Sequence, residues 1–105
     1  MTIIVLNGPN LNLLGERDAD TYGTETLEHI NKKLEQSYPD IDFIHVQSNH
    51  EGELIDAVQS ARNGSADALI ANWGGFTHSS VAIRDALELL TIPKVEVHMS
   101  NIHAR

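Results

Sequence analysis

Ile3-Ile-Val-Leu6 is an apolar, mostly β-branched run, and Asn7-Gly-Pro-Asn-Leu-Asn-Leu-Leu-Gly-Glu-Arg-Asp-Ala-Asp-Thr-Tyr-Gly23 follows it directly. The first four residues are typical of a buried β-strand. The segment after them is far longer than the roughly 2–6 residues that usually join a strand to a helix. It is interrupted by glycines and carries Asn, Arg and Tyr side chains. We therefore expect a strand followed by a functional loop that closes over a site.

Outward from this strand, strand and helix patterns alternate along the chain. The patterns predict strands over 2–6, 41–47, 66–72 and 94–99, and helices over 24–37, 51–62 and 78–90. Thr24 is the expected cap of the first helix, and Ser79 or Ser80 of the third. Alternating strands and helices form parallel sheets through right-handed crossovers. We predict a single α/β domain over 1–105, an open parallel sheet of flavodoxin-like order 2-1-3-4 with helices on both faces.

Two related architectures remain as alternatives. Half of a dinucleotide-binding fold has the same alternation, but no G-x-G-x-x-G follows the first strand and no G-x-x-x-x-G-K-[ST] occurs. A flavodoxin-like nucleotide or phospho-acceptor module needs an acidic cluster at the strand ends, whereas the first strand ends in Asn7.

The composition limits the kinds of molecule that the protein is expected to bind. Fifteen acidic residues against seven basic ones give a net charge of -8, which argues against nucleic acid and anionic membranes. Cysteine is absent, so disulfides, thiolate chemistry and cysteine-based metal sites are excluded. No signal-peptide pattern and no run of about 20 apolar residues is present. We expect a cytoplasmic protein that acts on a small molecule.

Polar side chains gather at one edge of the predicted sheet. Asn10 follows the first strand, Asn72 ends the third, and His98 and Ser100 end the fourth. The third helix begins at His78 beside the same edge. Ligands of open parallel sheets bind at the carboxyl ends of the strands. Asn is also a common turn residue, so the convergence of these side chains, rather than any one of them, predicts a site.

His98 is the strongest candidate for proton transfer, because imidazole exchanges protons near neutral pH. Strand alternation places Glu96 on the same side as His98, where a carboxylate can fix the tautomer of the ring. The remaining histidines of the strands and helices, His29, His45 and His50, are expected at the surface. A metal site at His98 and His103 is the alternative, but their spacing fits no usual helical ligand pair and no Cys supports it, so no metal is expected.

Tyr22 and Arg17 form a second candidate pair within the long loop. A phenol with a pKa near ~10 is a poor base at neutral pH. A guanidinium nearby lowers that pKa because it favours the phenolate. The alternative is that Tyr22 packs its ring on the domain while Arg17 is solvated.

Four segments of the chain together resemble the type II 3-dehydroquinate dehydratase family. They are Leu6-Asn-Gly-Pro-Asn-Leu-Asn-Leu-Leu-Gly15, Arg17 with Tyr22-Gly23, Asn72-Trp-Gly-Gly-Phe-Thr-His-Ser-Ser-Val-Ala-Ile-Arg-Asp85 and Glu96-Val-His-Met-Ser-Asn-Ile-His-Ala-Arg105. The resemblance implies a flavodoxin-like fold and a dodecamer built from trimers. It implies dehydration of 3-dehydroquinate to 3-dehydroshikimate without metal or organic cofactor, in the shikimate pathway of aromatic amino acid biosynthesis or in quinate breakdown.

The resemblance also implies roles in an anti elimination that passes through an enolate. Tyr22 matches the base, a tyrosinate, and Arg17 the residue that lowers its pKa. Asn10 matches the residue holding the water that stabilises the enolate. His98 matches the general acid that protonates the departing hydroxyl, and Glu96 orients it.

A second group of residues matches the family's substrate-binding positions. Asn72, His78 and Ser100 match groups that bind the hydroxyls and carboxylate of the substrate, with help from the backbone amide of Met99. Asp85 matches a position that contacts substrate from a neighbouring subunit.

The chain departs from the family in two places. Asp18-Ala-Asp-Thr21 stands where the family commonly has Pro, which predicts a looser lid. The family continues past His103-Ala-Arg105 with another substrate-binding arginine, a fifth strand and a long helix, so we expect a C-terminally truncated domain. The alternative function is therefore an inactive fragment or non-catalytic homologue that binds a small carboxylate or only assembles.

Overall fold

A parallel sheet of four strands forms the centre of the computed structural model, which describes residues 1–16 and 24–98. The strands are β1 Thr2–Asn7, β2 Asp42–Gln47, β3 Ala68–Asn72 and β4 Lys94–Glu96. Their order is β2-β1-β3-β4, and every neighbouring pair is parallel. The predicted order 2-1-3-4 is therefore confirmed.

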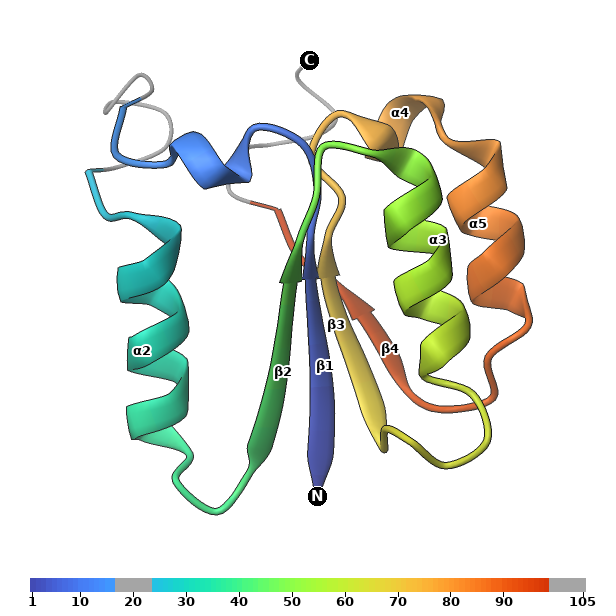
Figure 1. Ribbon diagram of the computed structural model, residues 1–105, viewed down its shortest axis with the longest axis horizontal. Helices are drawn as coiled ribbons and strands as arrows, with labels where there is room; N and C mark the ends of the chain where they lie inside the picture. The colour runs from blue at the N-terminus through green and yellow to red at the C-terminus, as the bar shows by residue number, and fades with distance from the viewer. Residues whose placement is uncertain (17–23, 99–105) are drawn as a thin grey trace.

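Helices cover both faces of this sheet, as predicted (Figure 1). Helix α2, Leu27–Ser37, lies on one face, while α3, Glu51–Ser60, and α5, Val81–Glu88, lie together on the other. Two short elements, η1 Leu11–Leu13 and α4 Phe76–Ser79, lie beyond the carboxyl ends of the strands. No helix in the described ranges is long and apolar enough to cross a membrane.

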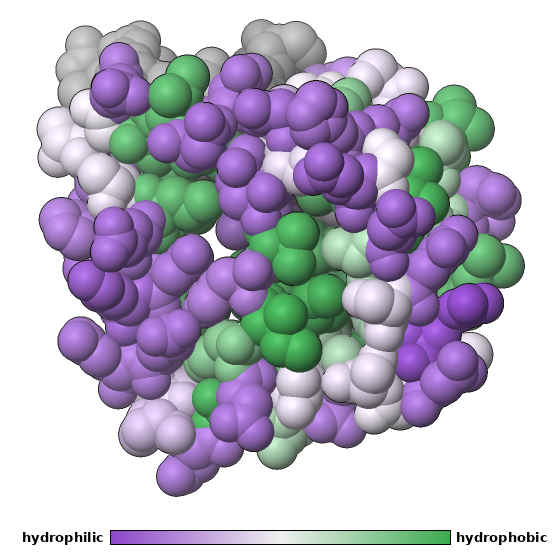
Figure 2. All heavy atoms as spheres, in the orientation of Figure 1, coloured by the Kyte–Doolittle hydropathy of each residue, from purple (hydrophilic) through white to green (hydrophobic). Residues whose placement is uncertain are grey.

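The hydrophobic core lies between the sheet and the α3–α5 layer. Its largest fully buried side chains are Leu6, Leu54, Val58 and Leu69. Helix α2, by contrast, has no buried residue. Figure 2 shows apolar side chains in the middle of one face, over the edge of the sheet between α2 and α3. Ile44 of the edge strand β2 is 45% exposed there, so this edge is only partly covered.

The predicted third helix is in fact two helices. Ser80 has an extended backbone (φ -94°, ψ 97°) that separates α4 from α5. Its hydroxyl accepts a hydrogen bond from the backbone N–H of Ile83 at 3.0 Å and donates one to the carboxylate of Glu51. Ser80, and not Ser79, is therefore the cap of α5, and His78 belongs to the separate helix α4.

The first helix begins three residues later than predicted. Thr26, rather than Thr24, is its N-cap, because the Thr26 hydroxyl accepts a hydrogen bond from the N–H of His29 at 3.2 Å. The third strand also begins later, at Ala68. Asp67 is held just before it, since its carboxylate accepts a hydrogen bond from the N–H of Thr2 at 2.8 Å.

The surface histidines follow the prediction with one exception. His29 and His50 are exposed. The side chain of His45 is only 19% exposed, its Nε2 lies 3.0 Å from Oε1 of Glu35, and its ring stacks on Phe43. The alternating β2 strand places this ring beneath α2, which a surface prediction from residue type alone misses.

Candidate active site

Three adjacent strands, β2, β1 and β3, end in polar side chains at the same level. In the sheet register, Asn7 of β1 is paired with Gln47 of β2 on one side and Asn72 of β3 on the other. The N–H of Gly8 donates to the carbonyl of Asn72 at 2.7 Å, which holds the chains together just beyond the sheet. This edge, at the carboxyl ends of parallel strands, is where such folds bind ligands.

Asn72 takes part in the turn that follows β3. Its side-chain oxygen accepts a hydrogen bond from the N–H of Gly74 at 3.2 Å, so the turn role that Asn often has is observed here. Its amide nitrogen donates no hydrogen bond within the described residues. A group in this position can donate to a bound hydroxyl or carboxylate.

Asn10 lies at the start of η1 in a left-handed conformation, with φ 70°. Its N–H donates to Oδ1 of Asn49 at 3.0 Å. The amide of Gln47 donates to the same oxygen at 3.3 Å and to the carbonyl of Gly8 at 3.2 Å. Gln47 and Asn49 therefore hold the backbone of the Asn10 turn, while Asn10 itself is exposed at the edge.

Sequence reasoning missed Gln47 and Asn49. The predicted site comprised the ends of the first, third and fourth strands and not the end of the second. The polar segment Gln47-Ser-Asn49 stands at the end of that strand and is the signal that identifies it.

Glu96 and His98 lie together, although the predicted strand over 94–99 is shorter than expected: β4 ends at Glu96, and His98 lies two residues beyond it. Oε2 of Glu96 is 3.5 Å from Nε2 of His98. The side chain of His98 is 16% exposed, whereas that of Glu96 is 44% exposed. Nδ1 of His98 is buried and has no hydrogen-bond partner within the described residues. A histidine that faces a carboxylate through one nitrogen and keeps the other unpaired is suited to proton transfer.

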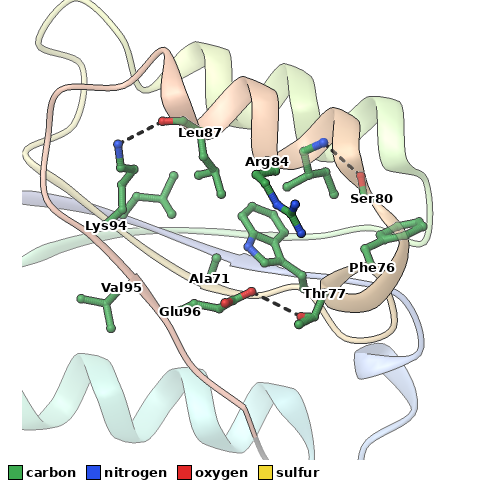
Figure 3. Close-up of a pocket in the computed structure, with 12 residues that line it drawn as sticks. Ala71, Phe76, Thr77, Ser80, Arg84, Leu87, Lys94, Val95 and Glu96 are labelled. Atoms are coloured by element: carbon green, nitrogen blue, oxygen red, sulfur yellow. Dashed lines mark hydrogen bonds between the residues drawn. The ribbon is translucent and has the colours of Figure 1, made fainter. Parts of the chain in front are cut away.

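Thr77 of α4 also contacts this pair (Figure 3). Its hydroxyl donates to Oε1 of Glu96 at 3.3 Å, across the groove between α4 and β4. Arg84 of α5 lines the same groove. Thr77 was not among the predicted site residues. Its position next to the candidate His78 is the feature of the sequence that could have indicated it.

The remaining candidates are not all joined to this group. His78 is exposed on α4, and Asp85 is exposed on α5. No hydrogen bond or ion pair links either side chain to another candidate in the ranges that the structure describes. Arg17, Tyr22, Met99 and Ser100 lie outside those ranges. The described part of the chain contains no group of three or more His, Cys, Asp or Glu residues that could hold a metal ion.

Comparisons with known proteins lead to a single family. The family model for class II dehydroquinase matches residues 1–105. The 3-dehydroquinate dehydratase of Polynucleobacter necessarius subsp. necessarius (strain STIR1) is 53% identical, over 99% of this chain and 71% of that protein. The 3-dehydroquinate dehydratase 1 of Pseudomonas aeruginosa is 51% identical, over 99% of this chain and 72% of that protein.

Solved structures lead to the same family. The crystal structure of the type II dehydroquinase from Butyrivibrio crossotus DSM 2876 superposes with a TM-score of 0.93 at 44% identity, over 100% of this chain and 74% of that one. The type II dehydroquinase from Propionibacterium acnes superposes with a TM-score of 0.89 at 36% identity. Enzymes with these names are hydro-lyases, and the chain belongs to the class II dehydroquinase family.

Proposed function

We propose that this protein dehydrates 3-dehydroquinate to 3-dehydroshikimate by an anti elimination through an enolate. A base takes the proton from the carbon beside the ketone, and the electron pair of that C–H bond forms the enolate. The enolate collapses to a carbon–carbon double bond as the β-hydroxyl leaves, protonated, as water. The match of the family to the whole chain is the observation that carries this proposal.

We assign His98 as the general acid, with Glu96 as the residue that orients it. The contact of Glu96 with Nε2 supports this assignment, because a carboxylate there favours a fixed tautomer and a fixed ring orientation. Asn10, exposed beside the strand ends, is assigned to the water that stabilises the enolate oxygen. Tyr22 is assigned as the base and Arg17 as the group that lowers its pKa, and both assignments rest on the family resemblance.

Substrate binding is assigned to Asn72, His78, Ser100 and the backbone amide of Met99. The exposed position of Asp85 on α5 is compatible with a contact to substrate in a neighbouring subunit of a trimer-based dodecamer. The proposal includes a cytoplasmic reaction in the shikimate pathway that needs no metal or organic cofactor.

The test is an absorbance assay with 3-dehydroquinate, in which the conjugated enone of the product appears. We expect turnover that a chelator does not reduce. Tyr22→Phe keeps the ring and removes the base, so kcat should fall by about 10²-fold or more with little change in substrate binding. A Tyr22→Phe variant that keeps most of the kcat would show that the base is misassigned.

Absence of turnover would contradict the proposal. Calorimetry with 3-dehydroquinate then separates the remaining possibilities. Binding without turnover is the result for a non-catalytic homologue, and no binding is the result for a chain that only assembles.

A further inference from the structure

Glu96 needs an external restraint if it is to hold His98 in one orientation. It is the last residue of β4, a strand of only three residues at the edge of the described sheet. Its side chain is 44% exposed. A glutamate loses considerable rotamer freedom when it is fixed in one conformation, so a half-exposed Glu samples several rotamers unless a second contact selects one.

Thr77 supplies that contact. Its hydroxyl donates to Oε1 of Glu96 at 3.3 Å, and Oε2 of the same carboxylate lies 3.5 Å from Nε2 of His98. The two oxygens of Glu96 are thus divided between Thr77 and His98, as Figure 3 shows for the Thr77 side.

The backbone and side chain of Thr77 make it a suitable anchor. Its N–H donates to the carbonyl of Gly74 at 3.2 Å, which fixes α4 on the turn after β3. As a β-branched residue it has few χ1 rotamers. It is also half-buried, unlike its neighbour His78. The bond joins α4 to β4 across 19 positions of sequence, so it is a tertiary contact and not a cap of its own helix.

We propose that Thr77 is a positioning residue that acts through Glu96 on His98. Thr77 selects the Glu96 rotamer in which the carboxylate faces Nε2, so the neutral ring carries its proton on Nε2 and donates as an acid only after it has taken up a second proton. Nδ1 is buried and has no partner in the described ranges, so the contact with Glu96 is the one that orients the ring there. The other charged groups beside this carboxylate are Arg84, which lines the same groove, and Lys94, whose ammonium is bound to the carbonyls of Leu87 and Leu90. The catalytic consequence rests on the proposed role of His98.

The experiment compares Thr77→Val, which removes the hydroxyl and keeps the shape, with Thr77→Ser, which keeps the hydroxyl. Thr91→Val, at an exposed position between α5 and β4, is the matched control. We expect Thr77→Val to lower kcat by about 10-fold with KM nearly unchanged, a part of what acid catalysis contributes. Thr77→Ser should restore most of the rate, and Thr91→Val should leave it unchanged.

A second measurement does not depend on activity. Nitrogen NMR of the His98 ring in the full chain should show one tautomer, protonated on Nε2, in the original protein and in Thr77→Ser. Thr77→Val and Glu96→Gln should both shift the ring toward a mixture of tautomers.

The outcomes separate this inference from the proposed function. If the unmodified protein turns over substrate and Thr77→Val has the same kcat and the same His98 spectrum, Thr77 has no positioning role. If the unmodified protein does not turn over substrate, the proposed function and the catalytic consequence fail together. The tautomer spectra then still decide whether Thr77 fixes Glu96 against His98.

Discussion

Gly8 is the residue at which the sheet edge tolerates no side chain. A Cβ at this position would lie 2.2 Å from the carbonyl oxygen of Trp73 and 2.6 Å from its carbonyl carbon. Both are backbone atoms, so relief requires the β1 and β3 chain ends to move apart. We expect Gly8→Ala to lower the free energy of unfolding by about 1–3 kcal/mol, the range for overpacked sites, as measured by urea denaturation.

Gly52 provides the matched control for this prediction. It lies in α3, and a Cβ there meets no atom within 4 Å. Gly52→Ala should therefore be neutral or stabilising by up to about 1 kcal/mol, since Ala is the better helix former. Equal stability of the two variants would mean that the β1–β3 edge yields to an extra methyl group.

At the scale of single residues, the sequence predicts the chemical role of a side chain better than it predicts which residues that side chain contacts. The proximity of Glu96 and His98 was predictable because the two residues are only two positions apart, even though β4 ends at Glu96 and does not include His98. Thr77 and Asn49 escaped prediction because their partners, Glu96 and Asn10, are distant in sequence. Only the folded arrangement brings those pairs together.

At the scale of elements, an ion pair joins Glu25, just before the N-cap of α2, to Lys33 within the helix. The ammonium of Lys33 contacts the carboxylate of Glu25 and holds the pKa of Glu25 below its usual value of 4.5. A pKa lowered by folding stabilises the protein above the unfolded value, and that stabilisation is lost as the pH falls through the folded value. Because both side chains are well exposed, we expect a small effect that salt weakens.

The measurement is thermal denaturation of Glu25→Gln as a function of pH. The variant should be slightly less stable than the original protein at neutral pH, and the difference should vanish at pH values well below 4.5. Glu88→Gln removes the same charge from an exposed site without an ion pair in the described ranges, so it should show no such loss. A Glu25→Gln difference that persists at low pH would assign the effect to something other than this pair.

The types and order of the elements were predictable, whereas several of their ends were not. Apolar periodicity located the four strands and the helices α2, α3 and α5, but Thr24 and Thr26 are equally good caps by residue type. The hydrogen bond from His29 decides in favour of Thr26. In the same way, the break at Ser80 depends on the carboxylate of Glu51 from a different helix.

At the scale of the whole molecule, the two faces of the sheet are unequally packed. Leu54 of α3 is fully buried in the core, whereas Leu34 of α2 is only half-buried and its helix has no buried residue. Removing a buried leucine side chain costs its transfer free energy and leaves a cavity. Leu54→Ala should therefore lower the free energy of unfolding by about 2–5 kcal/mol. Leu34→Ala should cost about 1 kcal/mol, near the value of a single buried methylene group.

Urea denaturation of the two variants tests this asymmetry, and native-state hydrogen exchange of the unmodified protein gives an independent measure. Amides of α2 should exchange through openings of lower free energy than amides of α3, because fewer buried apolar contacts hold α2 to the sheet. Similar losses in both variants, with similar protection of both helices, would mean that the α2 face is buried in solution as completely as the α3–α5 face.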